Sequence, residues 1–499
     1  MNVKARYAAI IVVLAVLIGA AGSYVGMQYF GVGEESPSER LANASQGGEN
    51  FGNLSEEEQK KFIENMAGST NLKKVEQAFG VIKDNALKDV DQQKLVEGAI
   101  QGMLDTLEDP YSVYMDKETM DQFSQTIESS FQGIGAEVSM VNDKVTIVAP
   151  IKGSPAEEAG LKPNDQILQV DGESLEGLDL YEAVLKIRGE KGSEVTLKVE
   201  RPGASEPLSI DIVRDDIPLE TVYTDTKTIN GKEAGVIEIT SFSEKTAEDF
   251  KKALKKLESD GMEGLVIDVR GNPGGLFTDV QEILKEFIPK DQPIVQVEDS
   301  KGEVSRYFSD IESKKDYPIT VLMDEGSASA SEILAATMHE AGGYELVGTK
   351  SFGKGTVQQT IPMGDGSTIK LTLFKWLTPD GNWIHEKGVK PTVKVKQPAY
   401  FYTNPVEVKE PLTFDSNGEK VKNIQEMLKG LGYSPGRTDG YFSEETKAAL
   451  EKFQTDHQLD VSGEVDKETA GKIEELIVKE VRDEENDRQM KKALEVLFQ

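Results

Sequence analysis

Asp324-Glu-Gly-Ser327-Ala-Ser329-Ala-Ser331-Glu332-Ile333 follows the apolar run Ile319–Met323 and opens a helical pattern that extends to Glu340. Its small residues let another backbone approach closely, and the start of a helix offers free N–H groups. A serine in this position can attack a carbonyl while a neighbouring N–H stabilises the oxyanion. Serine is also a preferred N-cap residue, so capping by Ser327, Ser329 or Ser331 is the simpler interpretation of this segment alone.

A second unit of the same kind lies upstream. The apolar run Gly264–Asp268 leads into Arg270-Gly-Asn-Pro-Gly274-Gly275 and then a helical pattern near Thr278–Phe287. Repeated strand–loop–helix order predicts an α/β fold with crossover connections and function at the strand ends. Two adjacent glycines allow N–H groups to converge as an oxyanion hole requires. A tight turn before a helix is the alternative.

A lysine between glycines lies downstream, in Ser351-Phe-Gly-Lys354-Gly-Thr-Val-Gln358. Burial lowers the pKa of a lysine, and a neutral amine can act as a general base. The alternative is a lysine on a surface turn; the glycine spacing of a phosphate-binding loop is absent. A histidine base fits the spacing poorly, because His339 lies ~15 Å from Ser329 along the same predicted helix. A serine–lysine pair is therefore favoured over a serine–histidine pair.

The composition excludes several other chemistries. The 499 residues include 56 Lys and Arg, 88 Asp and Glu, three His and no Cys, which gives a net charge of −32. Such a field repels phosphate backbones, so we expect no nucleic-acid partner. Without cysteine there are no disulfides and no thiolate chemistry. We expect no metal site and no cofactor.

The N-terminus carries a membrane signal. Tyr7–Phe30 is apolar and uncharged, follows Lys4 and Arg6, and is long enough to cross a bilayer. The charge order keeps the N-terminus cytoplasmic and places the remaining residues outside the cytoplasm. A retained single-pass anchor in the cell membrane is the favoured interpretation, and a cleaved signal peptide, which would give a secreted protein, is the alternative.

The pattern of composition and periodicity divides the chain into eight parts. They are 1–30, anchor or signal; 31–54, linker; 55–127, helices; 128–213, a β-rich module; 214–397, the α/β domain; 398–411, linker; 412–478, a small helical module; and 479–499, an acidic tail. We expect the tail to be a solvated helix or disordered. Its last six residues, Leu494–Gln499, resemble the remnant of a cleaved purification tag.

The three loops together resemble the C-terminal processing peptidases, tail-specific serine proteases with a serine–lysine dyad. The resemblance extends from about residue 60 to 397 and rests on Gly-Ser-Ala-Ser-Ala-Ser-Glu, Phe-Gly-Lys-Gly-Thr-Val-Gln and Arg-x-Asn-Pro-Gly-Gly. It implies an α/β core of the crotonase or Clp-protease type, Ser329 as nucleophile, Lys354 as base and Gln358 as the residue that holds the lysine. The implied oxyanion donors are the N–H groups of Gly275 and Ala330, with Gly274 as a further candidate. Asp109-Pro-Tyr-Ser-Val-Tyr114 is a further segment of family type, for which a structural role is expected.

Two flanking modules also resemble known domains. Residues 128–213 resemble a PDZ domain, which implies that Gly133, Ile134, Gly135 and Ala136 bind the C-terminal carboxylate of a protein substrate beside strand Ala136–Met140. Arg188 either complements the dipole of helix Leu180–Ile187 or links the bound tail to the active site. Residues 412–478 resemble a peptidoglycan-binding domain, which makes cell-wall glycan a candidate partner.

The sequence therefore predicts a membrane-anchored, extracytoplasmic serine endopeptidase that cleaves protein tails. Relatives in spore formers cleave signalling proteins between two membranes, so envelope or sporulation signalling is an expected setting. The helices of residues 60–125 carry more apolar faces than a stalk needs, and the family resemblance implies that such helices form a homodimer; packing on the protease's own sheet is the alternative. A non-catalytic tail-binding protein is the second hypothesis, and a wall hydrolase lacks the acid pair or metal site that it needs.

Overall fold

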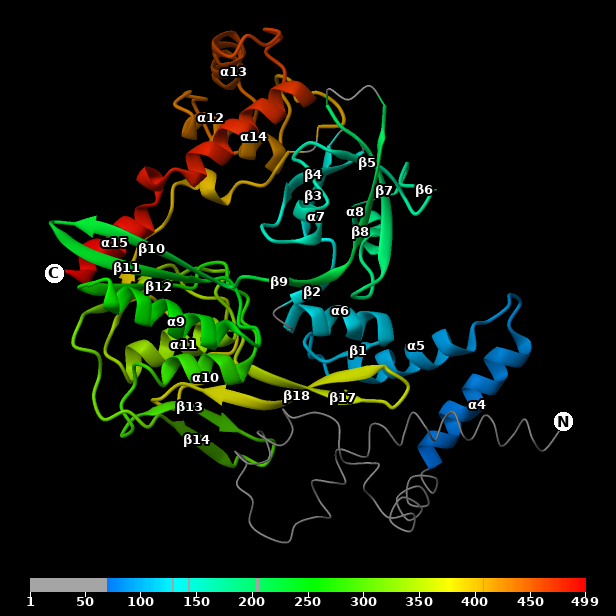
Figure 1. Ribbon diagram of the computed structural model, residues 1–499, viewed down its shortest axis with the longest axis vertical. Coiled ribbons are helices and arrows are strands. Elements are labelled where there is room, and N and C mark those ends of the chain that lie inside the picture. Colours follow the sequence, from blue (N-terminus) through cyan, green and yellow to red (C-terminus); the bar gives the residue numbers. More distant parts are fainter. Residues whose placement is uncertain (1–69, 128–129, 142–143, 179, 203–205, 407) are drawn as a thin grey trace.

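A six-stranded sheet forms the centre of the α/β domain (Figure 1). The computed structural model describes residues 70–499 except 128–129, 142–143, 179, 203–205 and 407. In order across the sheet, the strands are β10 (Val222–Ile229), β11 (Lys232–Ile239), β12 (Gly264–Asp268), β15 (Ile319–Met323), β16 (Glu345–Gly348) and β19 (Val393–Lys394). β10 runs antiparallel to β11, and the other neighbours are parallel. The two apolar runs predicted as buried strands are β12 and β15, which confirms both predictions.

Three helices cover one face of this sheet: α9 (Thr246–Ser259), α10 (Phe277–Leu284) and α11 (Ala330–Glu340). All five residues of β12 and of β15 are buried, as expected for parallel strands covered on both faces. The core on this face is built from both the strands and the helices and includes Ile237, Phe250, Ile267, Leu284, Val321 and Leu334. The predicted strand–loop–helix order is thus the observed one.

A second sheet lies on the far side of α10 and α11 (Figure 1). It orders β1 (Val113–Met115), β18 (Thr368–Leu377), β13 (Pro293–Glu298) and β14 (Val304–Phe308), and β17 (Thr356–Pro362) also pairs with β18. β1 comes from the N-terminal helical region and pairs antiparallel with β18, with Val113 opposite Lys370. This strand brings the N-terminal region to the sheet that carries the predicted base loop.

The C-terminal helix α15 (Arg488–Leu497) covers the other face of the six-stranded sheet. Ala493, Leu494 and Leu497 are buried against β11, β12, β15 and β16. The prediction of a solvated or disordered tail is therefore wrong, because Met490, Ala493, Leu494 and Leu497 place one apolar face on the sheet. The residues that resemble a tag remnant form part of this face.

The β-rich module is a six-stranded sheet with two helices. Its strands are β3 (Ala136–Val141), β4 (Lys144–Pro150), β5 (Gln166–Val170), β6 (Glu173–Ser174), β7 (Glu194–Glu200) and β8 (Leu208–Val213), and its helices are α7 (Pro155–Glu158) and α8 (Leu180–Ile187). It has a separate core that includes Ile147, Val195 and Leu197. A two-stranded ribbon, β2 (Ser130–Gly133) with β9 (Asp215–Pro218), connects it to the remaining chain (Figure 1).

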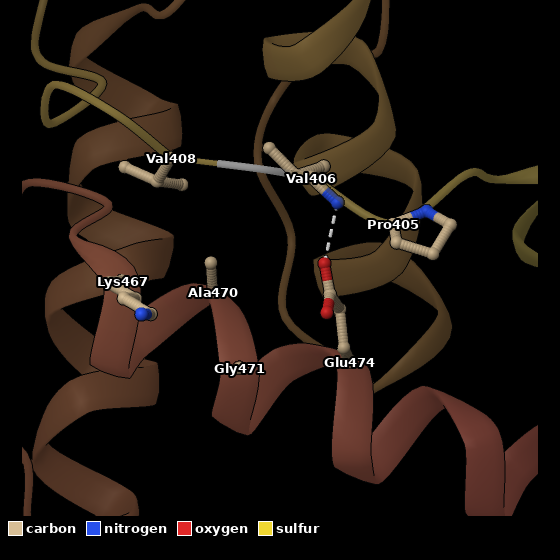
Figure 2. A pocket seen from close by; sticks show the side chains of 7 residues that line it. All are labelled: Pro405, Val406, Val408, Lys467, Ala470, Gly471 and Glu474. Atoms are coloured by element: carbon tan, nitrogen blue, oxygen red, sulfur yellow. Dashed lines mark hydrogen bonds between the residues drawn. The ribbon is translucent and has the colours of Figure 1, made fainter. Parts of the chain in front are cut away.

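The C-terminal module packs α12 (Glu419–Gly430), α13 (Glu444–Asp456) and α14 (Lys467–Arg482) around Ile424, Phe453 and Ile473. The short helices η1 (Ala399–Tyr402) and η2 (Glu484–Asn486) flank it. A cavity of about 390 Å³ lies between the preceding linker and α14 (Figure 2). Val406 N–H donates to Glu474 at 2.5 Å across it. The cavity lies outside the three loops that are predicted to carry chemistry.

The N-terminal helices α4 (Thr70–Asn85), α5 (Gln92–Asp105) and α6 (Lys117–Ile127) lead into the β-rich module. Ile100 and Leu104 of α5 are buried, whereas Val81, Ile82 and Met103 are exposed. Within residues 70–499, apart from the gaps given above, no helix is long and apolar enough to cross a membrane. The predicted anchor, residues 1–30, and the linker 31–54 lie outside the described residues.

Candidate active site

Three loops that follow neighbouring parallel strands form the candidate site. The oxyanion loop, residues 269–276, follows β12; the nucleophile loop, residues 324–329, follows β15; and the base loop, residues 349–355, follows β16. Because β12, β15 and β16 are adjacent and parallel, their carboxyl ends lie at the same edge of the sheet. The topology therefore brings together residues that are up to 86 positions apart in the sequence.

Ser329 differs from the two serines that flank it. Ser327 Oγ donates to Val269 O at 2.7 Å and Ser331 Oγ donates to Asn272 O at 2.9 Å, and both side chains are fully buried. These two serines fasten the nucleophile loop to the oxyanion loop. Ser329 is partly exposed and has φ +54° and ψ −113°. A non-glycine residue held at such a strained turn between strand and helix is common at functional sites.

Two backbone N–H groups beside Ser329 are available to an oxyanion. In the described part of the chain, no hydrogen-bond acceptor is recorded for Gly275 N–H or Ala330 N–H. By contrast, Gly274 N–H donates to Asn272 Oδ1 at 2.8 Å, which removes Gly274 from the candidate donors. A Cβ on Gly274 would lie 2.8 Å from Ser329 Cβ and 3.1 Å from Ala330 N, so the oxyanion loop lies directly against Ser329.

Glu332 joins the nucleophile loop to the base loop, and its side chain is fully buried. Its Oε2 accepts hydrogen bonds from Ser329 N–H at 2.9 Å and Lys354 N–H at 2.8 Å. Its Oε1 accepts from Ser351 Oγ at 2.5 Å and Gly353 N–H at 2.7 Å. Sequence reasoning missed this residue, although Ser-x-x-Glu at a helix start is the signal of a capping box.

Lys354 is half-buried at the end of the base loop. Burial lowers the pKa of its amine, the positive charge of Lys370 lowers it further, and Asp109 and Glu332 act in the opposite direction. Nζ lies over the ring of Tyr111, 4.6 Å from its centroid. Over the described residues, no hydrogen bond joins Nζ to Ser329 Oγ, so the structure brings the two loops together without closing the predicted dyad.

Gln358, on β17, does not contact Lys354 through a recorded hydrogen bond in this part of the chain. Its amide donates to Thr356 Oγ1 at 2.9 Å and Thr372 Oγ1 at 3.0 Å. The contact implied by the family resemblance is therefore not formed in this structure, and the amide is held on the neighbouring strand β18.

The histidine that lies beside the site is His385 and not His339. His339, near the end of α11, places Nδ1 3.0 Å from Tyr344 O in the loop that follows the helix. His385 accepts Gly355 N–H at 3.3 Å and stacks on Trp383 at 5.1 Å between centroids. His385 is thus the histidine beside the base loop, which the order of residues in the sequence does not show.

Arg270 ties the oxyanion loop to α15. Its guanidinium pairs with Asp268 at 2.7 Å and makes two hydrogen bonds to Asp487, of 3.0 and 2.9 Å. Asp487 is the N-cap of α15, and its side chain accepts Met490 N–H. The C-terminal helix therefore contacts the catalytic edge as well as the face of the sheet.

The predicted carboxylate-binding loop lies between β2 and β3. No acceptor is recorded among the described residues for the N–H groups of Ile134 and Gly135, and Gly135 has φ +75°. A Cβ there would lie 2.4 Å from Ser154 Cβ, so the loop requires glycine. Ser154 Oγ donates to Gly135 O at 2.7 Å and fixes the turn at the start of strand β3, which begins at Ala136.

Arg188 follows the last residue of α8. Its guanidinium lies over the ring of Phe131, 4.9 Å from the centroid, and a Cβ on Gly133 would contact its Cγ at 3.7 Å. Arg214, which sequence reasoning missed, donates to the last carbonyls of α8, Ile187 O at 2.8 Å and Lys186 O at 3.3 Å. The end of α8 is thus bonded by Arg214, while Arg188 contacts the connecting strand β2.

Among the described residues, no group of three or more His, Asp or Glu can hold a metal ion.

Comparison with known proteins identifies the family of the chain and three further domain matches. The sequence profile of peptidase family S41 matches residues 233–395, that of the activating protease CtpB N-terminal domain 16–119, that of the PDZ domain 132–212, and that of a putative peptidoglycan binding domain 417–473. Carboxy-terminal processing protease CtpB of Bacillus subtilis (strain 168) is 56% identical over 427 residues, which cover 86% of this chain and 89% of that protein. Carboxy-terminal processing protease CtpA of the same organism is 42% identical over 430 residues, with coverages of 86% and 91%.

A solved photosystem II D1 C-terminal processing protease aligns with 66% of this chain and 87% of its own, at 27% identity and a TM-score of 0.41. A partly exposed serine lies at a strained strand–helix turn, beside a half-buried lysine and two N–H groups that make no hydrogen bond among the described residues. This arrangement defines the class as a serine-type peptidase. The chain belongs to peptidase family S41 and is a carboxy-terminal processing serine protease with a PDZ domain and a peptidoglycan-binding-type domain.

Proposed function

We propose that the chain is a membrane-anchored, extracytoplasmic endopeptidase in which Ser329 is the nucleophile and Lys354 the general base. The observation that carries the proposal is the pair of hydrogen bonds from Ser329 N–H and Lys354 N–H to Glu332, which holds the two loops against each other. The N–H groups of Gly275 and Ala330 then stabilise the oxyanion of the tetrahedral intermediate.

The chemistry follows from the state of the lysine. Burial favours the neutral amine of Lys354, which can take the proton of Ser329 Oγ as the oxygen attacks a peptide carbonyl. The same group then returns the proton to the leaving amine. For this step Nζ must move from the ring of Tyr111 toward Ser329, where Gln358 is the predicted residue that holds it.

The test is cleavage of an unstructured protein by single and double variants. Ser329→Ala and Lys354→Ala should each abolish turnover, and the double variant should be no worse, because members of one catalytic unit act non-additively. His385→Asn tests the competing base. If Lys354→Ala kept turnover while His385→Asn lost it, the base assignment would be wrong.

We further propose that the PDZ domain gates cleavage. A protein tail would add beside β3 with its carboxylate on the N–H groups of Ile134 and Gly135. Arg188 contacts Phe131 of β2, and β2 with β9 is the ribbon that leads from the PDZ domain to the protease. A tail that binds one position of this ribbon more tightly than another would shift the population of active enzyme.

Membrane attachment, dimerisation and setting complete the proposal. Residues 7–30 support a single-pass anchor, and fractionation of cells that express the full chain tests it. The exposed apolar residues Val81, Ile82 and Met103 support a homodimer through the N-terminal helices. Light scattering of residues 45–499 should give the mass of a dimer, and a monomer at micromolar concentration would refute it. The resemblance of the C-terminal domain to peptidoglycan-binding domains supports a location at the cell wall. The proposed biological role is proteolysis in envelope or sporulation signalling.

A further inference from the structure

The segment Asp109–Ser112 lies against the catalytic base, although it belongs to the N-terminal region. Ser112 Oγ donates to Asp109 at 2.6 Å and accepts Thr372 N–H at 3.0 Å, so the segment is fastened to β18. Thr372 is also the residue whose hydroxyl accepts from Gln358. The segment therefore touches both the strand that holds Gln358 and, through Tyr111, the lysine itself.

The contact between Tyr111 and Lys354 is a cation–π contact, with Nζ 4.6 Å from the ring centroid. Tyr111 is itself half-buried, and its ring packs edge-on against His385 at 6.3 Å between centroids. A ring whose position is fixed in this way presents its face to the amine. Such a contact favours a protonated amine over a neutral one, because the ring quadrupole attracts positive charge.

We propose that Tyr111 is a positioning residue for the base: its ring holds the Lys354 ammonium away from Ser329 in the resting enzyme, and catalysis begins when the amine leaves the ring. This inference rests on the proposed role of Lys354. It gives the N-terminal segment a part in the reaction, beyond the structural role that the sequence indicates. When Nζ lies over the ring, the amine is thus both away from Ser329 and protonated.

Several charged and titratable groups face this amine and must be considered together. The positive charge of Lys370 on β18 lowers the pKa of Lys354, whereas the negative charges of Asp109 and Glu332 raise it. His385 packs on Tyr111 from the loop after β18, and Glu386 lies near enough to act on the Tyr111 hydroxyl. Substitutions that leave all of these unchanged and alter only the ring face isolate the effect of Tyr111.

The first experiment measures kcat/KM against pH for the full chain and two variants. Tyr111→Phe keeps the ring face, and Tyr111→Leu keeps apolar bulk without it. The rate rises with pH as Lys354 loses its proton. Loss of the ring face should lower the pKa of the free enzyme's base and move the rising limb about 0.5–1 pH unit toward acid. Tyr111→Phe and the neighbouring control Tyr114→Phe should keep the wild-type limb.

The second experiment reads Lys354 without catalysis. Lysines of the Ser329→Ala protein are reductively methylated with ¹³C-formaldehyde and observed by NMR, and the Lys354 signal is identified by its loss in Lys354→Arg. A ring-current shift should be present with tyrosine or phenylalanine at position 111 and absent with leucine. This readout also covers the case in which Tyr111→Leu folds too poorly for kinetics, because Tyr111→Phe must still retain the shift.

The outcomes separate this inference from the proposed function. Retained turnover in Lys354→Ala would refute the dyad. A different set of results would refute only the role of Tyr111. These results are loss of turnover in Lys354→Ala, an unchanged rising limb in Tyr111→Leu, and no ring-current shift of the Lys354 signal when tyrosine is present at position 111. An equal displacement of the limb in Tyr111→Phe and Tyr111→Leu would assign the effect to the hydroxyl and overturn the proposal as well.

Discussion

Ser329 and Lys354 are joined through their backbones, because both N–H groups donate to the same carboxylate oxygen of Glu332, at 2.9 and 2.8 Å. The backbones of the proposed nucleophile and the proposed base are thus held close together whatever the positions of the two side chains. The carboxylate accepts from four donors in all, which an amide of the same shape cannot do.

Glu332→Gln should therefore reduce kcat on the order of 10–100-fold with a smaller change in KM, because displacement of the reacting groups is costly even when the fold survives. It also removes a negative charge near Lys354, so the rising limb of the pH–rate profile should move toward acid. Glu325→Gln is the matched control, since among the described residues the Glu325 carboxylate accepts one hydrogen bond, from Thr349 Oγ1. Equal kinetics in the two variants would contradict the role of Glu332.

The pH dependence should respond in the opposite sense to Lys370→Met. Lys370 lowers the pKa of Lys354, so its removal raises that pKa and moves the rising limb of kcat/KM toward alkaline pH. Lys375→Met, on the same strand but paired with Glu298, should leave the limb in place. A shift toward acid, or a rate that is flat from weakly acidic to alkaline pH, would argue against Lys354 as the base.

The oxyanion loop should tolerate no side chain at Gly275. A Cβ there would lie 2.0 Å from Phe242 O, so Gly275→Ala must displace the loop and its N–H. We expect a loss of kcat on the order of 10²–10³-fold, as for removal of an oxyanion donor. In Gly271→Ala nothing lies within 4 Å of the new Cβ, and the unfavourable φ of +65° is the remaining cost. Similar kcat values for the two variants would remove Gly275 from the oxyanion hole.

The C-terminal helix should contribute measurably to stability. Leu497 is buried between α15 and the sheet, and Leu497→Ala should lower the free energy of unfolding by about 2–3 kcal/mol in a denaturant titration. Lys492→Ala, on the exposed side of α15, should change it little. If both variants unfold at the wild-type midpoint, α15 does not hold the sheet in solution.

Arg188→Ala should leave the enzyme folded but poorly activated by tails. The measurement is steady-state cleavage of an unstructured protein with and without an apolar C-terminal peptide. The control is Lys186→Ala. This substitution removes an exposed ion pair with Glu173 from the last turn of the same helix, α8. Equal activation of both variants and the wild type would reduce the PDZ domain to a tether for substrates.

The sequence carries the parts of this site that depend on local pattern. β12 and β15 are apolar runs, and the glycine and serine loops after them have a composition that suits close approach. Glu332 was visible as the last residue of a Ser-x-x-Glu pattern, but its bonds to Gly353 and Lys354 depend on which strands are neighbours. The face of α15 was hidden because charged residues surround Met490, Ala493, Leu494 and Leu497, which share one side only at helical spacing.

Other features depend on contacts between distant segments. Tyr111 contacts Lys354 because β1 pairs with β18. Nothing in the sequence around either residue indicates that the two side chains are neighbours. The position of Lys354 Nζ is also beyond the reach of sequence pattern, since one set of residues allows it to rest on a ring or to bond Ser329. Arg214 replaces Arg188 at the end of α8 because the fold brings β8 to that helix end.

Residues 487–497 follow every strand of the protease sheet in the chain, by more than ninety residues after β19. During synthesis, the strands and Ser329 therefore emerge from the ribosome while one face of the sheet is uncovered and Arg270 lacks its partner Asp487. A nascent chain in this state has its catalytic residues but not the anchor of its oxyanion loop. The order of residues along the chain thus delays completion of the protease sheet until α15 has been synthesised, at a time when the emerging chain itself is the nearest unfolded polypeptide.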